Sequence, residues 1–347
     1  MSRHRIIQRW RNRVDMAQRQ ERHVLIVGCG QLGSRHLQAV ASLPQVAQIE
    51  VVDPRREALS CGRTRLDEAP DRQPMMSIRW LSSLDEATSG GDLCIVATQA
   101  QGRCQLMREI VQRCGYRRFL LEKIVGQSIR EIEELEQFLR VRECAAWVNL
   151  KTRAYPIHQR AKQRLDPAEP LLFSALGGNH GLANNGVHTA DLFAFYDGAS
   201  RIDLVGASID PVLHPSKRGE QVFDLSGTLQ GATEKGSHFT LSYARDHAQS
   251  EVLSITTRRY RCVVDHMNRW AVESDASTKW NWRPVPFEDD ILVSHMTKAF
   301  VTDILASGRC DLPTLAESLA AHRFILGALQ PTFSELFEQS VEYCPVT

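Results

Sequence analysis

The 347-residue chain has no run of 18 or more apolar residues and no marked excess of charge of either sign. Without a long apolar run, a membrane-spanning helix of the usual length is not expected. The 42 Lys and Arg residues nearly balance the 41 Asp and Glu residues, and the formal net charge is +1. No overall field therefore favours nucleic acid or an anionic membrane as a partner.

The nine cysteines include no C-x-x-C pair, and their odd number does not suit a disulfide framework. Several lie inside apolar runs, such as Cys94 in LCIVA and Cys144 in ECAAWV. This pattern is typical of reduced thiols that pack as small apolar side chains in a cytoplasmic protein. We expect a cytoplasmic location and no metal site.

Residues 1–22 are rich in arginine and lack the apolar segment of a signal peptide. We expect a basic, mobile extension there. An organellar transit segment is the alternative, and Asp15 and Glu21 argue against it.

The pattern of apolar and polar residues changes near residue 150. Before it, short apolar runs alternate with helical patterns, which predicts an α/β Rossmann domain over residues 23–149 with a parallel sheet covered on both faces. The expected strands are 23–28, 48–53, 76–81, 92–98, 117–123 and 143–149. After it, alternating runs between 201 and 285 predict a large, mostly antiparallel sheet, and helical patterns return at the end. Residues 150–347 are therefore expected to form an α+β domain.

The stretch IVGCGQLGSRH contains G-x-G-x-x-G directly after the first expected strand and at the start of a helix. Glycines at these positions allow a tight turn, the approach of a pyrophosphate, and close packing of helix on strand. The helix N-terminus adds free N–H groups for the phosphates. We expect this turn to bind a dinucleotide through Gly28, Gly30, Gln31, Leu32 and Gly33. A glycine-rich turn that binds nothing is the alternative.

Asp53 ends the second expected strand, 20 residues after Gly33, where an acidic residue holds the adenosine ribose hydroxyls. A carboxylate there favours NAD. Arg55 and Arg56 follow at once and could hold the extra phosphate of NADP, so NADP stays an alternative.

Two further segments carry reactive side chains. Glu122 and Lys123 close the fifth expected strand, where the carboxyl ends of parallel strands form a ligand crevice. A lysine there can hydrogen-bond a substrate hydroxyl or carbonyl; an exposed Glu–Lys pair is the alternative. In NNGVHTADLF, a helix start would place Asn184, His188 and Asp191 on one face. That segment alone is also explained by an asparagine N-cap with a core histidine behind it.

The succession GCGQLGSRH, DLCIVAT, EK and NNGVHTADLF resembles the Gfo/Idh/MocA oxidoreductase family, over nearly the whole chain after residue 22. The resemblance implies NAD(P)-dependent oxidation or reduction of a sugar or cyclitol hydroxyl, and homodimers or homotetramers formed through the antiparallel sheet. It implies that Lys123 and His188 are catalytic and that Asn184 and Asp191 bind substrate. It adds Thr98 and Glu122 to the expected cofactor contacts.

Three positions depart from that family's motifs. Ile124 stands where proline usually follows the lysine, Asn184 stands where an aspartate usually precedes the histidine, and Arg103 stands where a histidine often follows the fourth strand. Asn184 cannot accept a proton, so acid–base work falls to His188, Lys123 or both.

The segment VNLKTRAYP lies at the end of the last Rossmann strand. Similar family members contact substrate through this segment, and the resemblance therefore implies substrate contacts for Asn149, Arg153 and Tyr155. Arg153 could hold a carboxylate or phosphate bidentately, or lie on the surface. The sequence thus predicts an oxidoreductase acting on a sugar-type substrate, for example a nucleotide sugar or acidic sugar of cell-surface glycan metabolism. A catalytically impaired dinucleotide-binding sensor or scaffold is the alternative, motivated by Ile124 and Asn184.

Overall fold

The computed structural model of the chain describes residues 21–178, 180–216, 219, 221–247, 250–287 and 292–347. The expected basic extension lies outside these ranges apart from Glu21 and Arg22. Arg22 already belongs to the first strand.

A six-stranded sheet has the order β3-β2-β1-β4-β5-β6, and the pairs β1–β2, β1–β4 and β2–β3 are parallel. Its strands are β1 (Arg22–Val27), β2 (Val46–Val52), β3 (Ser77–Leu81), β4 (Leu93–Val96), β5 (Arg118–Leu121) and β6 (Ala145–Val148). The connecting helices are α2 (Gln31–Ala41), α3 (Arg56–Asp67), α4 (Arg103–Glu109) with a π-helical turn (Ile110–Cys114), and α5 (Ile129–Val141). All six strands lie where the sequence predicted them, so the Rossmann prediction is confirmed.

A second sheet has eight strands in the order β16-β15-β14-β13-β7-β12-β11-β8, and its pairs are antiparallel except β7–β12. Its strands are β7 (Leu172–Gly178), β8 (Asp203–Ile209), β11 (Gly227–Ala232), β12 (His238–Ala244), β13 (Val252–Thr256), β14 (Tyr260–Asp265), β15 (Trp270–Asp275) and β16 (Arg283–Pro284). A separate short pair joins β9 (His214–Pro215) to β10 (Phe223–Asp224). The remaining helices are α6 (Pro156–Arg164), α7 (Gly186–Asp197), α8 (Val293–Ser307) and α9 (Leu315–Leu336).

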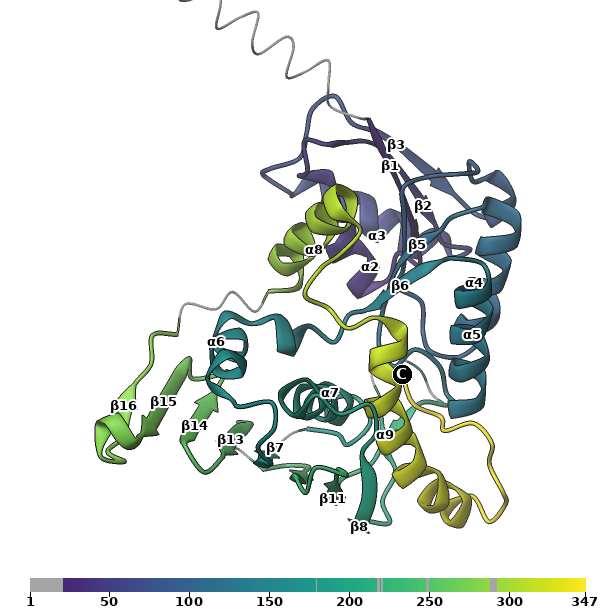
Figure 1. Cartoon of the computed structure of the whole chain (residues 1–347). Coiled ribbons are helices and arrows are strands. Elements are labelled where there is room, and N and C mark those ends of the chain that lie inside the picture. Colours follow the sequence, from purple (N-terminus) through teal and green to yellow (C-terminus); the bar gives the residue numbers. More distant parts are fainter. Residues whose placement is uncertain (1–20, 179, 217–218, 220, 248–249, 288–291) are drawn as a thin grey trace, which may run out of the picture. The chain divides into compact units, whose positions relative to one another are not determined.

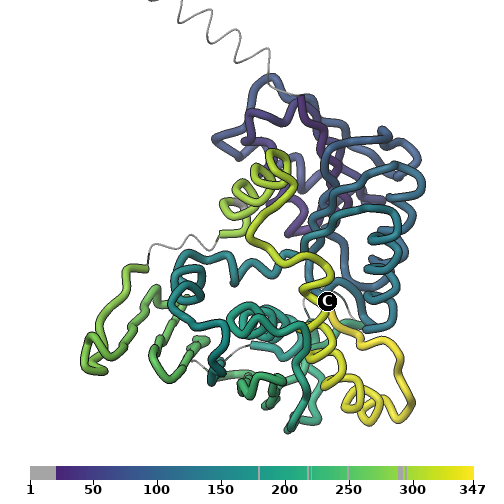
Figure 2. The backbone as a smooth tube through the Cα atoms, in the orientation of Figure 1, coloured from purple at the N-terminus to yellow at the C-terminus, as the bar shows by residue number. Residues whose placement is uncertain are grey.

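The chain divides into two compact units that are not continuous in sequence. The first comprises residues 21–98, Ile110–Phe119 and Val293–Cys310, and the second comprises Gln99–Glu109, Leu120–Leu292 and Asp311–Thr347. The first unit includes α8, because this helix packs on α2 (Figures 1 and 2). The domain boundary expected after residue 149 stays a prediction. His36 of α2 and Thr297 of α8 are both buried and hydrogen-bond at 2.9 Å.

Aromatic side chains form the core between the second sheet and its helices. Phe239 of β12 stacks on Phe193 of α7 with ring centroids 4.9 Å apart, and it contacts Phe173 of β7 and Phe324 of α9 at 5.7 and 5.3 Å. All four rings are at most 2% exposed. Burying such rings stabilises a fold by about 1.5–3 kcal/mol each, so this cluster fixes α7 on the sheet. Within the described ranges, no helix combines the length and apolar character that crossing a bilayer requires.

Candidate functional site

The turn between β1 and α2 admits only glycine at two positions. Gly28 has φ +91°, and a Cβ there would lie 2.9 Å from the backbone of Ala97. A Cβ on Gly33 would lie 1.9 Å from the carbonyl oxygen of Gly28. The motif therefore closes the turn and brings the helix against the strand, as the sequence indicated.

Gly30, between them, faces open space. It is the N-cap of α2, its φ is −68°, and the nearest atom to a Cβ there would be a guanidinium nitrogen of Arg55 at 3.8 Å. The first turn of α2 has no acidic residue and no side-chain cap. Gln31 and Leu32 lie in this turn and are exposed and partly exposed. A helix N-terminus of this kind attracts a phosphate group through its N–H groups and its dipole.

Asp53 lies immediately after β2, in the same unit as this turn. Its carboxylate, 2% exposed, accepts hydrogen bonds from the backbone N–H of Cys29 at 2.8 Å and of Arg55 at 2.9 Å. The Arg55 guanidinium adds two contacts at 3.2 Å. Burial acts to raise the pKa of Asp53, but the hydrogen bonds from Arg55 and Cys29 outweigh it and hold the pKa below its ordinary value. The carboxylate is thus ionised, and Arg55 binds it from the solvent side.

In the second unit, Lys123 lies just after β5 and is 8% exposed. Its ammonium donates a hydrogen bond to the backbone oxygen of Asn184 at 2.6 Å and another, short one to the Asn184 side-chain oxygen. The peptide bond between Lys123 and Ile124 is cis. The structure therefore brings together two of the residues that the sequence assigned to the site from separate motifs.

A buried arginine holds the loop that carries Lys123. Arg103, 1% exposed, donates hydrogen bonds to the carbonyl oxygens of Glu122, at 2.6 Å, and Ile124. These carbonyls flank Lys123. The sequence marked Arg103 only as a departure from a family motif, because nothing in its local pattern shows that it is buried.

His322 of α9 holds the same loop from another side. The backbone N–H of Val125 donates to its Nε2 at 3.2 Å, and its Nδ1 donates to the carbonyl oxygen of Ser318 at 2.9 Å. Burial lowers the pKa of His322 to about 4, so the ring is neutral and Nε2 can accept.

Glu122 and Asn149 also meet. The Asn149 amide donates to Glu122 Oε1 at 2.7 Å, and both residues are at most 6% exposed. Thr98 lies two residues after the end of β4, in the first unit, and is partly exposed. The cofactor contacts expected of Thr98 and Glu122 and the substrate contact expected of Asn149 stay predictions.

The segment NNGVHTADLF forms a turn followed by α7, which begins at Gly186, so Asn184 precedes the helix. Asn185 occupies the N-cap position, but its side chain makes no capping hydrogen bond. His188 is half-buried, and its backbone N–H donates to the Asn185 carbonyl at 3.0 Å. The alternative of an asparagine N-cap therefore lacks the hydrogen bond between the Asn185 side chain and the first turn of the helix that it would require.

Asp191 and Arg153 form a buried ion pair. The guanidinium donates to the carboxylate through Nε at 2.8 Å and Nη2 at 2.6 Å, and the two side chains are 1% and 8% exposed. A substrate anion bound by Arg153 would have to share this guanidinium with Asp191. Tyr155 is buried against His158 and His266, with ring centroids 6.0 and 5.3 Å apart. Substrate binding by Arg153, Tyr155 and Asp191 stays a prediction.

Asp224, which the sequence reasoning missed, supports the turn before α7. Its carboxylate accepts the backbone N–H groups of Ala183 at 2.8 Å and Asn184 at 3.0 Å. No sequence signal identifies it, because β10 contains only Phe223 and Asp224 and follows an irregular stretch.

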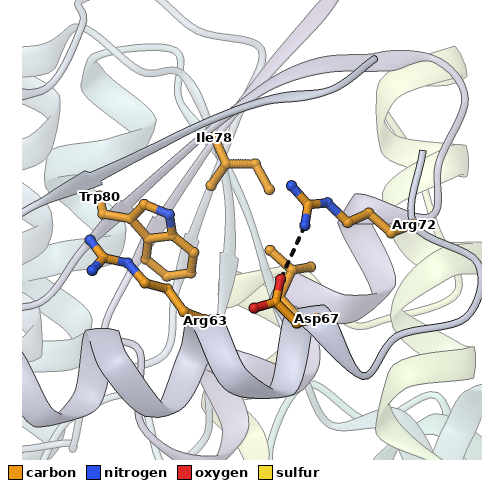
Figure 3. A pocket seen from close by; sticks show the side chains of 6 residues that line it. Arg63, Asp67, Arg72, Ile78 and Trp80 are labelled. Carbon is orange, nitrogen blue, oxygen red and sulfur yellow. Dashed lines mark hydrogen bonds and ion pairs between the residues drawn. The ribbon is translucent and has the colours of Figure 1, made fainter. Parts of the chain in front are cut away.

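A hollow of about 240 Å³ lies between α3 and β3 in the first unit (Figure 3). The Arg63 guanidinium lies 5.0 Å from the centre of the Trp80 ring, and Arg72 pairs with Asp67 at 3.3 Å. No residue assigned to the site from the sequence lines it. Among the described residues, no three His, Cys, Asp or Glu side chains gather as metal ligands would.

We compared the chain with known protein families, curated sequences and solved structures. No protein-family model and no curated protein sequence matches the chain. Solved structures do match over nearly the full length. An oxidoreductase from Agrobacterium radiobacter, in complex with NAD+, L-tartaric acid and magnesium, has a TM-score of 0.73 at 14% identity, over 91% of this chain and 97% of its own.

Two further structures are similar. UDP-N-acetylglucosamine 3-dehydrogenase from Acidithiobacillus ferrooxidans has a TM-score of 0.68 at 17% identity, over 93% of this chain and 98% of its own. A Gfo/Idh/MocA family oxidoreductase from Vibrio cholerae has a TM-score of 0.66 at 15% identity, over 92% of this chain and all of its own. At these identities the likeness establishes the fold, and it confirms at that level the family resemblance expected from the sequence.

Proposed function

We propose, from the fold shared with Gfo/Idh/MocA oxidoreductases and from the glycine turn after β1, that the protein is an NAD(P)-dependent oxidoreductase. The observation that carries the proposal is the Lys123 ammonium, nearly buried after β5 and held by Asn184. A fold alone does not establish an activity. Support for the activity comes from the contact between Lys123 and Asn184, two residues that separate motifs assign to the site.

The residues of the first unit fit a dinucleotide. Gly30 and the first turn of α2, with Gln31 and Leu32, would hold the pyrophosphate, and Asp53 would accept the adenosine ribose hydroxyls. We propose NAD as the cofactor, because the ionised Asp53 carboxylate repels a 2′-phosphate. NADP stays the alternative, since Arg55 is 66% exposed and could reach such a phosphate. When bound, the nicotinamide would exchange a hydride with a carbinol or carbonyl carbon.

The chain's own residues would bind and polarise the substrate oxygen. Lys123 would donate a hydrogen bond to that oxygen, and the developing negative charge on it strengthens the interaction in the transition state. His188 would take up or return the hydroxyl proton. Asn184 has only an amide, so its role would be to orient Lys123.

We propose a sugar-type substrate, such as a nucleotide sugar or an acidic sugar. Support comes from the similar structures, since one is a nucleotide-sugar dehydrogenase and another holds a hydroxy acid. Asn149, Arg153, Tyr155, Asn184 and Asp191 would shape the pocket for it. Turnover of a panel of nucleotide sugars and sugar acids, followed at 340 nm, tests this assignment.

We also propose a cytoplasmic homodimer or homotetramer joined through the eight-stranded sheet. Leu172 and Leu176 of β7 are 56% and 48% exposed and lie on the same face of that strand. Light scattering of wild type and Leu176→Lys tests this interface. We expect the variant to have the smaller molar mass in solution. Met75→Lys, at a 93% exposed apolar residue of the first unit, is the matched control.

Substitution of Lys123 tests the catalytic role and separates it from the alternative of an impaired sensor. Lys123→Met keeps the length of the side chain and removes the charge, so the expected loss in kcat is about 10²- to 10⁴-fold with cofactor binding retained. Lys279→Met, at an exposed lysine of the same unit, should change nothing. Equal turnover by Lys123→Met and wild type would contradict the proposal, and binding of cofactor with no turnover of any substrate would favour a sensor.

A further inference from the structure

Asp224 lies on the far side of Asn184 from Lys123. Asn184 uses its two oxygens to accept from the Lys123 ammonium, and its backbone N–H donates to Asp224 Oδ2 at 3.0 Å. One residue therefore links a buried cation to a carboxylate, with its dipoles oriented favourably towards both charges.

The carboxylate is built into the turn by several contacts. Its Oδ1 accepts the N–H groups of Ala183 at 2.8 Å and of Leu225 at 2.9 Å. Gly181 makes room for it, because a Cβ at that position would lie 2.0 Å from Oδ2. Three hydrogen bonds to backbone donors stabilise a carboxylate in its ionised form.

Charges around Asp224 are identifiable on the neighbouring elements. His214 is its partner across the β9–β10 pair, and Lys123 is the cation that acts on it. Burial raises the pKa of Asp224, while the backbone hydrogen bonds and the positive charge of Lys123 act against this rise. Asn184 connects the two charges, since its oxygens accept from Lys123 and its backbone N–H donates to Asp224.

We propose that Asp224 is a positioning residue for Lys123: it fixes the turn that presents both Asn184 oxygens and supplies the negative charge that an aspartate at position 184 would carry. Asn184, which binds the ammonium through its two oxygens, is neutral, and the Asp224 carboxylate on β10 binds the backbone N–H of the same asparagine. The arrangement orients the ammonium through the turn that Asp224 holds.

This inference rests on the proposed function for its catalytic meaning, but its first test needs neither cofactor nor substrate. Competitive acetylation with acetic anhydride at fixed pH, read by peptide mass spectrometry, measures the reactivity of the Lys123 amine relative to that of Lys279. Only the neutral amine reacts, so the loss of a nearby negative charge raises the rate. One pKa unit corresponds to a tenfold change, and an opposite charge a few ångströms away shifts a pKa by about that much or more.

Asp224→Asn should therefore raise the relative acetylation of Lys123 about tenfold. In Asn184→Asp/Asp224→Asn the carboxylate moves to position 184, and the rate should return to within about twofold of wild type. A merely structural role for Asp224 does not predict this rescue. Asp246→Asn, which removes an exposed carboxylate of the same unit, is the control and should leave the rate unchanged.

Gly181→Ala provides a second route if Asp224→Asn does not fold. Its added methyl group would displace the Asp224 carboxylate without changing the charge of the chain, and it should also raise Lys123 reactivity. Unchanged reactivity in folded Asp224→Asn or Gly181→Ala would overturn the proposal, as would a double variant that stays as reactive as Asp224→Asn.

Turnover gives the second readout where a substrate is found. Asp224→Asn should lower kcat at least tenfold, with NADH affinity unchanged, and the double variant should recover it. Failure of NADH to bind wild type would remove the proposed function and leave the acetylation result standing, so the two failures are distinguishable.

Discussion

Arg153 and Asp191 form a two-point ion pair in the second unit, with Nε and Nη2 of the guanidinium at 2.8 and 2.6 Å from the two carboxylate oxygens. Arg153 precedes α6 and Asp191 lies on α7, the helix that also carries His188. The pair therefore ties the segment after the Rossmann strands to the helix that bears a proposed catalytic side chain.

Removing one member of this pair should destabilise the fold strongly. Asp191→Leu leaves a buried, unpaired guanidinium, and such a change costs about 3–5 kcal/mol. Arg153→Met/Asp191→Leu leaves neither charge and should recover most of the loss. Urea unfolding of the three proteins gives the comparison, and a double variant as unstable as the single one would contradict the account.

The same carboxylate makes stability depend on pH in an unusual direction. Burial raises the pKa of Asp191 to about 6 in the folded state, against the opposing charge and hydrogen bonds of Arg153, whereas an unfolded aspartate titrates near 3.9. Between those values the folded state binds more protons, so this contribution to the free energy of unfolding falls as pH rises from about 4 to about 6. Its size is at most about 3 kcal/mol.

Urea midpoints measured across that range for wild type and Asp191→Asn test the effect. The stability of wild type relative to Asp191→Asn should decline from pH 4 to 6 and then level off. Parallel pH profiles would show that Asp191 is ionised throughout.

Arg103 should be needed for turnover although it is placed to act only through the Lys123 loop. Arg103→Met leaves the carbonyls of Glu122 and Ile124 without their guanidinium donor. We expect a loss of about 1–3 kcal/mol in stability for each unpaired carbonyl and a fall in kcat of tenfold or more. Arg103→His, which introduces the residue common at this position in the resembling family, should retain more activity than Arg103→Met.

Steady-state kinetics beside thermal unfolding separates the two effects. If both variants lose stability but keep wild-type kcat below their unfolding temperatures, the loop does not depend on Arg103 for its geometry.

Asp53 and Arg55 should set the choice between the two cofactors in opposite ways. Asp53→Ala removes the carboxylate that repels a 2′-phosphate. The affinity for NADPH relative to that for NADH should therefore rise by about tenfold or more. Arg55→Ala removes the guanidinium that binds this carboxylate and should raise the affinity for NADH relative to that for NADPH. Dissociation constants of both cofactors for both variants check this, and a ratio shifted the same way by the two substitutions would refute it.

Most of the fold could be predicted from the sequence, because its strands, helices and glycine turn depend on local patterns. Each apolar run before residue 150 became a strand of the parallel sheet, and the glycine spacing determined the turn at Gly28. The composition of the first compact unit did not follow from the sequence. The packing of α8 on α2 joins segments some 260 residues apart, and no local pattern reports it.

The same distinction applies to the site. Lys123 and Asn184 could be named from motifs, since each lies at a strand end or a helix start. Arg103 and Asp224 could not, because their roles arise from burial and from contacts with backbone groups of distant segments. The pairing of Arg153 with Asp191 was missed for the same reason, although each residue was singled out separately.

Dinucleotide binding at the turn after β1 is the basis of the proposed function, and calorimetric titration with NADH and NADPH measures it. We predict micromolar binding of one cofactor, with NADH preferred, to wild type purified free of nucleotide. Gly30→Asp, whose new carboxylate would lie in open space at the start of α2, should fold normally and lose that binding. Binding of neither cofactor by folded wild type, or equal binding by Gly30→Asp, would show that this turn is not a dinucleotide site.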